Sequence, residues 1–219
     1  DDVSIRDISY KTPGFSGAEL ENLLNESAIL AARDDKKMIG NNHIEKALER
    51  LTMGIEKSNL NDISRKRLVA YHEIGHALVA NSLPLADKVE KVTIIPRSGD
   101  VSGYTKFTPD EELIDSALVS KAYLMDKLVV ALGGRASEMI IYGREEVTQG
   151  ASGDLEQVFN LCKEMILRFG FSSLRLVSTV DADQAVFVGK SLISQKTDLS
   201  ESTINKVDQE IFHLAKQAL

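Results

Sequence analysis

The sequence predicts a mainly α-helical protein that contains a small β-sheet. Residues that favour helices, such as Ala, Leu, Glu and Lys, are abundant, whereas the 219 residues include only 4 prolines. Apolar residues recur with helical spacing over most of the chain. Residues 88–96 instead have the β-branched content, and residues 101–107 the partial alternation, that favour strands.

The first section of the chain, residues 1–57, is expected to form a small subdomain of two or three helices. Ser16 precedes a helical run and Glu19 stands three residues later, which is the spacing of a capping box. One apolar face is expected on this helix, made by Leu20, Leu23, Leu24, Ala28 and Ala31. A second helix covers NNHIEKALERLTMG and ends near Gly54. The polar stretch IEKSNLNDIS that follows is typical of a linker.

Residues 58–219 are expected to form a larger, mostly helical domain. The predicted elements are a helix over about 64–80, strands over KVEKVTIIP and VSGYTKF, and helices over 109–142, 152–169 and 201–219. Gly133 and Gly134 interrupt the longest of these helices, which indicates close packing against another element. The segments RSGD, GREEVTQGASGD and 170–191 are expected to be loops.

Composition excludes several classes of protein. The net charge of -7 and the dispersed basic residues argue against a nucleic-acid partner. The single cysteine, Cys162, excludes a disulfide framework and a Cys-rich zinc site, and is expected to be a buried helix residue. The sequence has no apolar run long enough to span a membrane and no secretory leader. Its abrupt polar start is typical of a fragment cut from a longer chain, so a targeting or anchoring segment could be missing rather than absent in nature.

The segment VAYHEIGHALV carries the clearest chemical pattern. On a helix, His72 and His76 lie on one face and can reach a single zinc ion. Glu73 can face the open coordination position, where it would act as general base toward a water. The pattern H-E-x-x-H therefore predicts two ligands and a base. The alternative is an ordinary core helix that contains two histidines.

A catalytic zinc needs a third protein ligand. His43 and His213 are expected on solvated helix faces, so a carboxylate is favoured. Asp154 follows a Gly-rich turn and begins a helix, although the helix dipole explains an acidic residue there equally well. Glu138 is a rival ligand or a supporting group. From the residues alone, the choice stays open.

Three segments, TPGFSGAELENLLNESAILAARDDKK, VAYHEIGHALV and VTQGASGDLEQV, resemble in order and spacing the FtsH family of membrane-anchored, ATP-dependent zinc metalloproteases. The resemblance extends from about residue 8 to at least residue 172. It implies that residues 1–57 are the helical lid subdomain of an AAA+ ATPase. It implies that residues 58–219 are a zinc metalloprotease domain of the peptidase M41 kind.

The family pattern implies roles for the matching positions. It makes His72 and His76 zinc ligands, Glu73 the catalytic base and Asp154 the third ligand. GGRASEMIIYG matches the family's GGR-x-AEE-x-I-x-G pattern, so the first glutamate of that pattern, Glu138, is expected to support the site from beside the ligands. The second glutamate of the pattern is replaced by Met139, and its contribution is lost or dispensable here.

The resemblance also implies cofactors and surroundings. The family's phosphate-binding loop and transmembrane helices would precede residue 1, and the chain contains no G-x-x-x-x-G-K-[ST]. ATP is therefore expected only in the full-length protein, where Gly17 and Ala18 would lie near the adenine. Many bacterial members have asparagine before the ligand aspartate, whereas this chain has Gly153. The form GDLEQ is closer to plastid and cyanobacterial members.

The implied activity is hydrolysis of unfolded or membrane polypeptides for protein quality control. The implied partners are the other subunits of a homo-hexamer or mixed hexamer, and a membrane reached through missing N-terminal segments. The domain would face the plastid stroma or the bacterial cytoplasm, with a preference for the plastid. The strand Ser102–Phe107 would pair with an extended substrate, or would be an ordinary second strand.

Two alternatives stay open at this point. The first is a catalytically inactive family member that has kept a structural or coupling role. The second is a helical interaction module with a structural metal, which predicts a closed site with four protein ligands.

Overall fold

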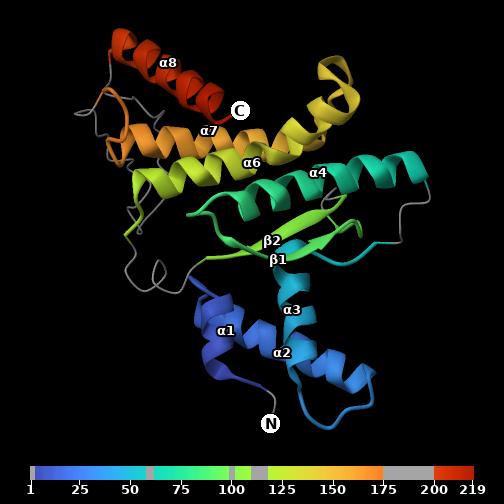
Figure 1. Cartoon of the computed structure of the whole chain (residues 1–219). Helices are drawn as coiled ribbons and strands as arrows, with labels where there is room; N and C mark the ends of the chain where they lie inside the picture. Colours follow the sequence, from blue (N-terminus) through green and yellow to red (C-terminus); the bar gives the residue numbers. More distant parts are fainter. Residues whose placement is uncertain (1–2, 58–61, 99–101, 110–117, 175–199) are drawn as a thin grey trace. The chain divides into compact units, whose positions relative to one another are not determined.

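The structure is a computed structural model that describes residues 3–57, 62–98, 102–109, 118–174 and 200–219. It is mainly α-helical with one small antiparallel sheet, which confirms the predicted fold class (Figure 1). The chain forms two compact units: Asp1–Ala77 with Asp87–Leu118, and Leu78–Ala86 with Val119–Leu219. These units do not test the expected domain boundary at residue 57, which stays a prediction.

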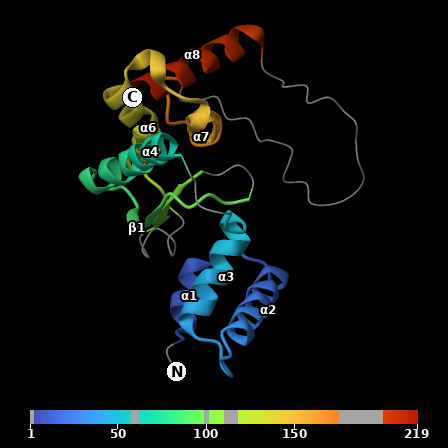
Figure 2. The same ribbon diagram turned by 90° about the vertical axis from the view of Figure 1, so that its right-hand side faces the viewer.

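The first unit begins with three helices: α1 (Ile5–Lys11), α2 (Gly17–Arg33) and α3 (Asn41–Met53). Helices α2 and α3 pack against each other (Figure 2). The predicted capping box opens α2, because Ser16 Oγ accepts from the Glu19 backbone N–H and Glu19 Oε2 accepts from the Ser16 backbone N–H. The core of this bundle is small and apolar, made by Leu23, Ile44, Ala47 and Leu48.

The predicted apolar face of α2 was too wide. The structure buries Leu23, Ser27 and Ala31, whereas the side chains of Leu20 and Leu24 are 37% and 53% exposed and Ala28 is exposed too. The buried residues form a single i, i+4, i+8 row. The other three lie on the adjacent row, about 60° around the helix. Ser27 is tolerated inside because its hydroxyl donates to the Leu23 carbonyl at 2.7 Å.

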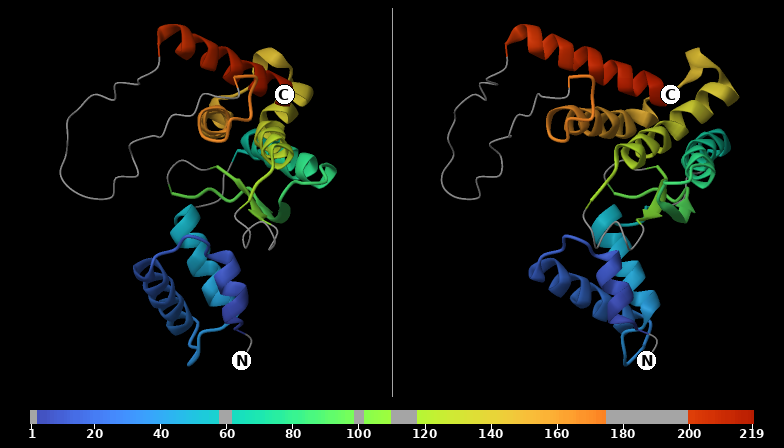
Figure 3. Two further views of the ribbon diagram at one scale, coloured as in Figure 1. Left: turned by 90° about the vertical axis from the view of Figure 1, so that its left-hand side faces the viewer. Right: turned by 60° about the vertical axis from the view of Figure 1, so that its left-hand side comes forward.

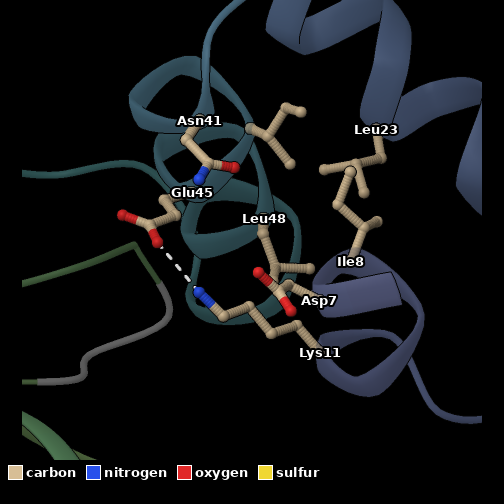
Figure 4. Close-up of a pocket in the computed structure, with 8 residues that line it drawn as sticks. Asp7, Ile8, Lys11, Leu23, Asn41, Glu45 and Leu48 are labelled. Atoms are coloured by element: carbon tan, nitrogen blue, oxygen red, sulfur yellow. Dashed lines mark hydrogen bonds and ion pairs between the residues drawn. The ribbon is translucent and has the colours of Figure 1, made fainter. Parts of the chain in front are cut away.

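A small pocket lies among the three N-terminal helices (Figure 4). Its apolar wall includes Ile8, Leu23 and Leu48. At its rim Lys11 Nζ donates to Glu45 Oε1 at 2.8 Å, which joins α1 to α3. The hydrogen bond to Glu45 also raises the pKa of Lys11. The ion pair therefore links the shortest helix of the bundle to α3 at the surface.

Removing the cap of α2 is expected to destabilise the N-terminal bundle. Ser16→Ala leaves the Glu19 backbone N–H without its side-chain acceptor, at a cost of about 1 kcal/mol. Urea unfolding followed by circular dichroism measures this loss. Ser16→Thr keeps a hydroxyl that can accept from the Glu19 backbone N–H and donate to Glu19 Oε2, and is expected to unfold nearly like the unsubstituted chain. An equal loss in both variants would contradict the capping role.

The first unit also contains most of α4 (Ile63–Ser82) and a hairpin of β1 (Lys88–Thr93) and β2 (Tyr104–Thr108). The strands pair antiparallel, with Val92 opposite Thr105, and a bulge lies between Val89 and Lys91. The predicted helix and both predicted strands are thus confirmed. The first two residues of RSGD are described, and the remainder of this predicted loop lies outside the described residues.

The stretch expected to be a linker is partly paired with the segment after β1. The backbone N–H of Lys57 donates to the Pro96 carbonyl at 2.8 Å, and that of Ser98 donates to the Ile55 carbonyl at 2.9 Å. Gly54, which ends α3, has a positive φ of 83° and faces Ser98, so a side chain there would be strained and would collide. Residues 55–57 are therefore held in a defined conformation.

The second unit contains α6 (Lys121–Tyr142), η1 (Arg144–Glu146), η2 (Gln149–Ala151), α7 (Ser152–Leu167) and α8 (Glu201–Ala218). Helices α6, α7 and α8 pack on one another (Figure 3). Cys162 is fully buried in α7, as predicted, and burial raises the pKa of its thiol to about 11. Among the described residues, no helix has both the length and the apolar character needed to cross a membrane.

The helix predicted over 109–142 is not continuous in the part of the chain that the structure describes. Residues 118–120 are not helical, and α6 begins at Lys121 because Ser120 Oγ accepts from the Tyr123 backbone N–H. Residues 110–117 lie outside the described residues. Gly133 and Gly134 are both buried within α6, as close packing requires. Of the predicted loop 170–191, only 170–174 are described, and these are not helical.

Candidate metal centre

His72 and His76 lie one turn apart on α4 and are both buried, at 8% and 7% exposed. Their Nε2 atoms are 3.1 Å apart, and the rings meet edge-on at 74°. Two nitrogen ligands of a tetrahedral zinc are about 3.3 Å apart, given Zn–N bonds of about 2.05 Å. The spacing therefore fits a shared zinc. A hydrogen bond between two neutral rings would have the same length.

Glu73 follows the first histidine and is also buried, with 7% of its surface exposed. Thr105 of β2 lies beside it: the Thr105 hydroxyl is 2.9 Å from Glu73 Oε2 and 3.0 Å from the Glu73 backbone carbonyl. Burying a carboxylate is costly unless hydrogen bonds replace its lost water. Thr105 supplies one such bond, which lowers the cost of burying the Glu73 side chain.

Asp154 lies in the first turn of α7 and is half-buried. One ligand atom from each of His72, His76 and Asp154 lies within 4.8 Å of the other two. In the part of the chain that the structure describes, these three residues form the one group of His, Cys, Asp and Glu found to suit a metal ion. Two imidazole nitrogens and one carboxylate oxygen are a donor set that zinc accepts.

Glu138 is completely buried in α6. Its Oε2 accepts from the Thr148 backbone N–H at 2.7 Å, and its Oε1 is 3.4 Å from the Thr148 hydroxyl. Thr148 in turn caps η2, which leads directly into α7. Glu138 thus anchors the loop that precedes Asp154 and is not itself in the candidate metal group.

The expected solvated position of His43 was wrong. His43 is 8% exposed, its Nδ1 accepts from the Gly40 backbone N–H at 2.9 Å, and its Nε2 is 3.5 Å from Asp34. The physical reason is that Gly40 occupies the N-cap of α3 and has no side chain, so the ring three residues later caps the helix end. His213 on α8 is exposed, as expected.

Three other residues were singled out from the sequence and are distant from His72 and His76 in sequence: Gly17, Ala18 and Met139. Gly17 and Ala18 are exposed in the first turn of α2, and a side chain at Gly17 would meet nothing within 4 Å. Met139 is half-buried in α6. The position of Gly17 and Ala18 near adenine stays a prediction. So does the effect of having Met139 where the family pattern has its second glutamate.

Sequence reasoning missed Thr105 as a neighbour of Glu73. The two residues are 32 positions apart, and a threonine on a strand is too common to attract attention. The one available signal is Gly103, since a glycine next to a strand indicates a close approach of another backbone or side chain.

A helix that buries two histidines one turn apart, with a glutamate after the first, is typical of zinc peptidases. Comparison with known proteins agrees with this class. Residues 59–219 match the model of Peptidase family M41, and residues 2–46 match that of the AAA+ lid domain. The chain therefore belongs to peptidase family M41.

Curated relatives support the same family. The chain is 47% identical to ATP-dependent zinc metalloprotease FTSH 5, chloroplastic, of Arabidopsis thaliana, over 99% of this chain and 31% of the relative. It is 46% identical to ATP-dependent zinc metalloprotease FtsH 3 of Synechocystis sp., over 99% of this chain and 35% of the relative. The predicted resemblance to the FtsH family is confirmed. The chain spans about a third of the length of the curated relatives it matches.

Proposed function

We propose that the chain is the AAA+ lid, residues 1–57, and the zinc endopeptidase domain, residues 58–219, of an ATP-dependent metalloprotease. The observation that carries this proposal is the buried pair His72 and His76, with Nε2 atoms 3.1 Å apart beside the buried Glu73. The relatives are named as ATP-dependent zinc metalloproteases, and these names support the same activity.

His72, His76 and Asp154 would hold the zinc, and Glu138 would support Asp154 through the loop at Thr148. The candidate group among the described residues has three members. Three protein ligands leave the fourth position open, as catalytic zinc requires, whereas a structural site is closed by four. This count favours an enzyme over a module with a structural metal.

When bound, zinc supplies a Lewis acid that polarises the scissile carbonyl and lowers the pKa of a water. Glu73 would take the proton of the attacking water and then return it to the leaving amine. The substrate would be an extended, unfolded polypeptide. It would add to the two-stranded sheet along Ser102–Phe107, where main-chain pairing tolerates many sequences.

The wider setting is proposed from the resemblance to the FtsH family. The substrates would be unfolded or membrane proteins, and the protein would act in quality control. ATP would bind a part of the protein outside this chain, with Gly17 and Ala18 near the adenine. The assembly would be a homo-hexamer or a mixed hexamer anchored in a membrane by other segments. The chloroplastic and cyanobacterial relatives favour the plastid stroma or the bacterial cytoplasm as the compartment.

The chain is expected to bind one zinc ion per molecule and to cleave unfolded casein only when zinc is bound. Asp154→Asn is expected to weaken zinc binding by more than about a hundredfold, because losing a ligand costs more than losing a group that supports one. His213→Ala, which changes an exposed histidine on α8, serves as the control and is expected to bind zinc normally. Competition with a chelator measures both affinities.

Three outcomes would contradict the proposal. If the unsubstituted chain binds no zinc, the proposed zinc site is wrong. Stoichiometric zinc without cleavage in a hexameric preparation would favour an inactive family member. A fourth protein ligand on the zinc would favour a structural metal.

A further inference from the structure

Strand β2 makes an unusually close approach to α4 at the position of Glu73. A Cβ atom added to Gly103 would lie 2.6 Å from Val69 Cγ1, 2.8 Å from the Thr93 carbonyl oxygen and 3.1 Å from Glu73 Cγ. Val69 and Glu73 are one turn apart on α4, so they lie on the same face of this helix. Only glycine allows the start of β2 to lie against that face.

The next two residues of the chain point to opposite faces of the hairpin, because side chains alternate along a strand. Tyr104 lies under the guanidinium of Arg97, whose Cζ is 5.5 Å from the ring centroid. Thr105 points the other way and places its hydroxyl 2.9 Å from Glu73 Oε2. The register of β2 therefore decides that a hydroxyl, and not a phenol, meets the glutamate.

We propose that Thr105 is a positioning residue for the catalytic base: its hydroxyl holds the Glu73 carboxylate in the orientation needed for proton transfer, and Gly103 makes that contact possible. The inference rests on the proposed peptidase function. It extends that function to a residue on a different element, which neither the H-E-x-x-H pattern nor the names of the relatives assigns.

The chemistry supports an orienting role. A glutamate side chain has three rotatable bonds, and proton transfer requires its carboxylate to stay within hydrogen-bond reach of the water. A hydrogen bond to a charged acceptor is stronger than one between neutral groups. The hydroxyl proton of Thr105 has two acceptors on Glu73, and the charged carboxylate is the stronger one. The bond limits the orientations that the Glu73 carboxylate can take.

Thr105→Val removes the donor and keeps the shape of the side chain. With a short fluorogenic peptide, which needs no unfolding by ATP, kcat is expected to fall about tenfold to a hundredfold, the worth of one hydrogen bond to a charged group. KM and zinc stoichiometry are expected to stay unchanged. Affinity for a dipeptide hydroxamate, which binds zinc and donates a hydrogen bond to the base, is expected to fall about tenfold.

Two further variants separate positioning from folding. Thr105→Ser keeps the hydroxyl and is expected to restore both kcat and hydroxamate affinity. Thr108→Val is the matched control: Thr108 lies on the same strand and donates to the Glu90 carboxylate at 2.8 Å, so its loss is expected to leave both unchanged.

The outcomes distinguish this inference from the proposed function. If the unsubstituted chain binds no zinc, both fail. If the unsubstituted chain binds zinc, and Thr105→Val has the same kcat and the same hydroxamate affinity as that chain, only the role of Thr105 is overturned. The same holds if Thr105→Ser does not restore the losses, because threonine would then act through packing.

Discussion

Replacing Glu73 by glutamine is expected to lower kcat for peptide hydrolysis by a factor of about a hundred to ten thousand, the usual contribution of a positioned general base. The substitution keeps the shape of the side chain, and the new amide oxygen can still accept from Thr105. Only the proton acceptor is lost. Stopped-flow or steady-state cleavage of a fluorogenic peptide measures the change, and zinc content is expected to stay at one ion per chain.

The same substitution is expected to leave the fold intact or to stabilise it. Glu73 is only 7% exposed, and burying a carboxylate costs free energy even when it is hydrogen-bonded. A residue that is kept for activity at a cost in stability commonly behaves in this way. A thermal midpoint equal to or above that of the unsubstituted chain would therefore separate loss of the base from loss of the fold.

A matched control is available on the same sheet. Glu90 also accepts a hydrogen bond from a threonine of β2, but it stands beside Lys106 rather than beside a histidine pair. Glu90→Gln is expected to keep full activity. If Glu73→Gln keeps activity as well, the base must be another residue. If Glu73→Gln loses zinc together with activity, its role is structural.

The parts of the fold that the sequence predicted are those with local signals. The capping box of Ser16 and Glu19 lies within four residues, and the helical period needs only a few turns to be visible. His72 and His76 share a helix, so their spacing in sequence already fixes their spacing in space. The role of Glu73 as general base was predicted from the same local pattern.

The parts that failed depend on competing or distant contacts. Residues 118–120 interrupt the helix predicted over 109–142, because the side chain of Ser120 caps the helix that begins at Lys121. His43 was expected in solvent because the sequence does not show that a ring can replace a missing N-cap side chain. Thr105 and Glu73 meet only because a hairpin packs on a helix, which no local pattern predicts.

Arg97 is the clearest case of a contact hidden from the sequence, where it belongs to an expected loop. Its side chain is only 2% exposed. Its Nη2 atom lies 2.9 Å from Glu49 of α3 and 2.9 Å from Glu56, and its Nη1 donates to the Gly54 carbonyl at 3.4 Å. Glu49 also pairs with Lys91 of β1 at 2.6 Å. This cluster, called here the Arg97 cluster, joins the end of α3 to the hairpin.

Arg97→Met is expected to destabilise the first unit by about 3 kcal/mol, the lower end of the cost of breaking a buried ion pair. The lower end applies because Lys91 still pairs with Glu49 after the change, and because Glu56 is mostly exposed. Urea unfolding measures the loss. Hydrogen exchange is expected to locate the loss of stability at the C-terminal end of α3 and in the hairpin. Arg97→Lys is expected to restore only part of it, since an ammonium cannot reproduce the planar, many-donor geometry of a guanidinium.

Arg168→Met is the matched control, because Arg168 makes an ion pair of the same length, 2.9 Å, with Glu164, but both side chains are 46% exposed. Its loss is expected to cost less than about 0.5 kcal/mol.

The loss of stability caused by Arg97→Met should also depend on pH. Burial alone would raise the pKa of Glu49, but the hydrogen bonds and charges of Lys91 and Arg97 outweigh it and hold the pKa below its usual value. A carboxylate with a lowered pKa contributes stability above its unfolded pKa of about 4.3 and loses that contribution as the pH falls through its folded pKa. The difference between Arg97→Met and the unsubstituted chain is therefore expected to be full at pH 7 and to shrink below about pH 4.3. If the stability difference between Arg97→Met and the unsubstituted chain is the same at pH 7 and below about pH 4.3, Arg97 acts through packing rather than through its charge.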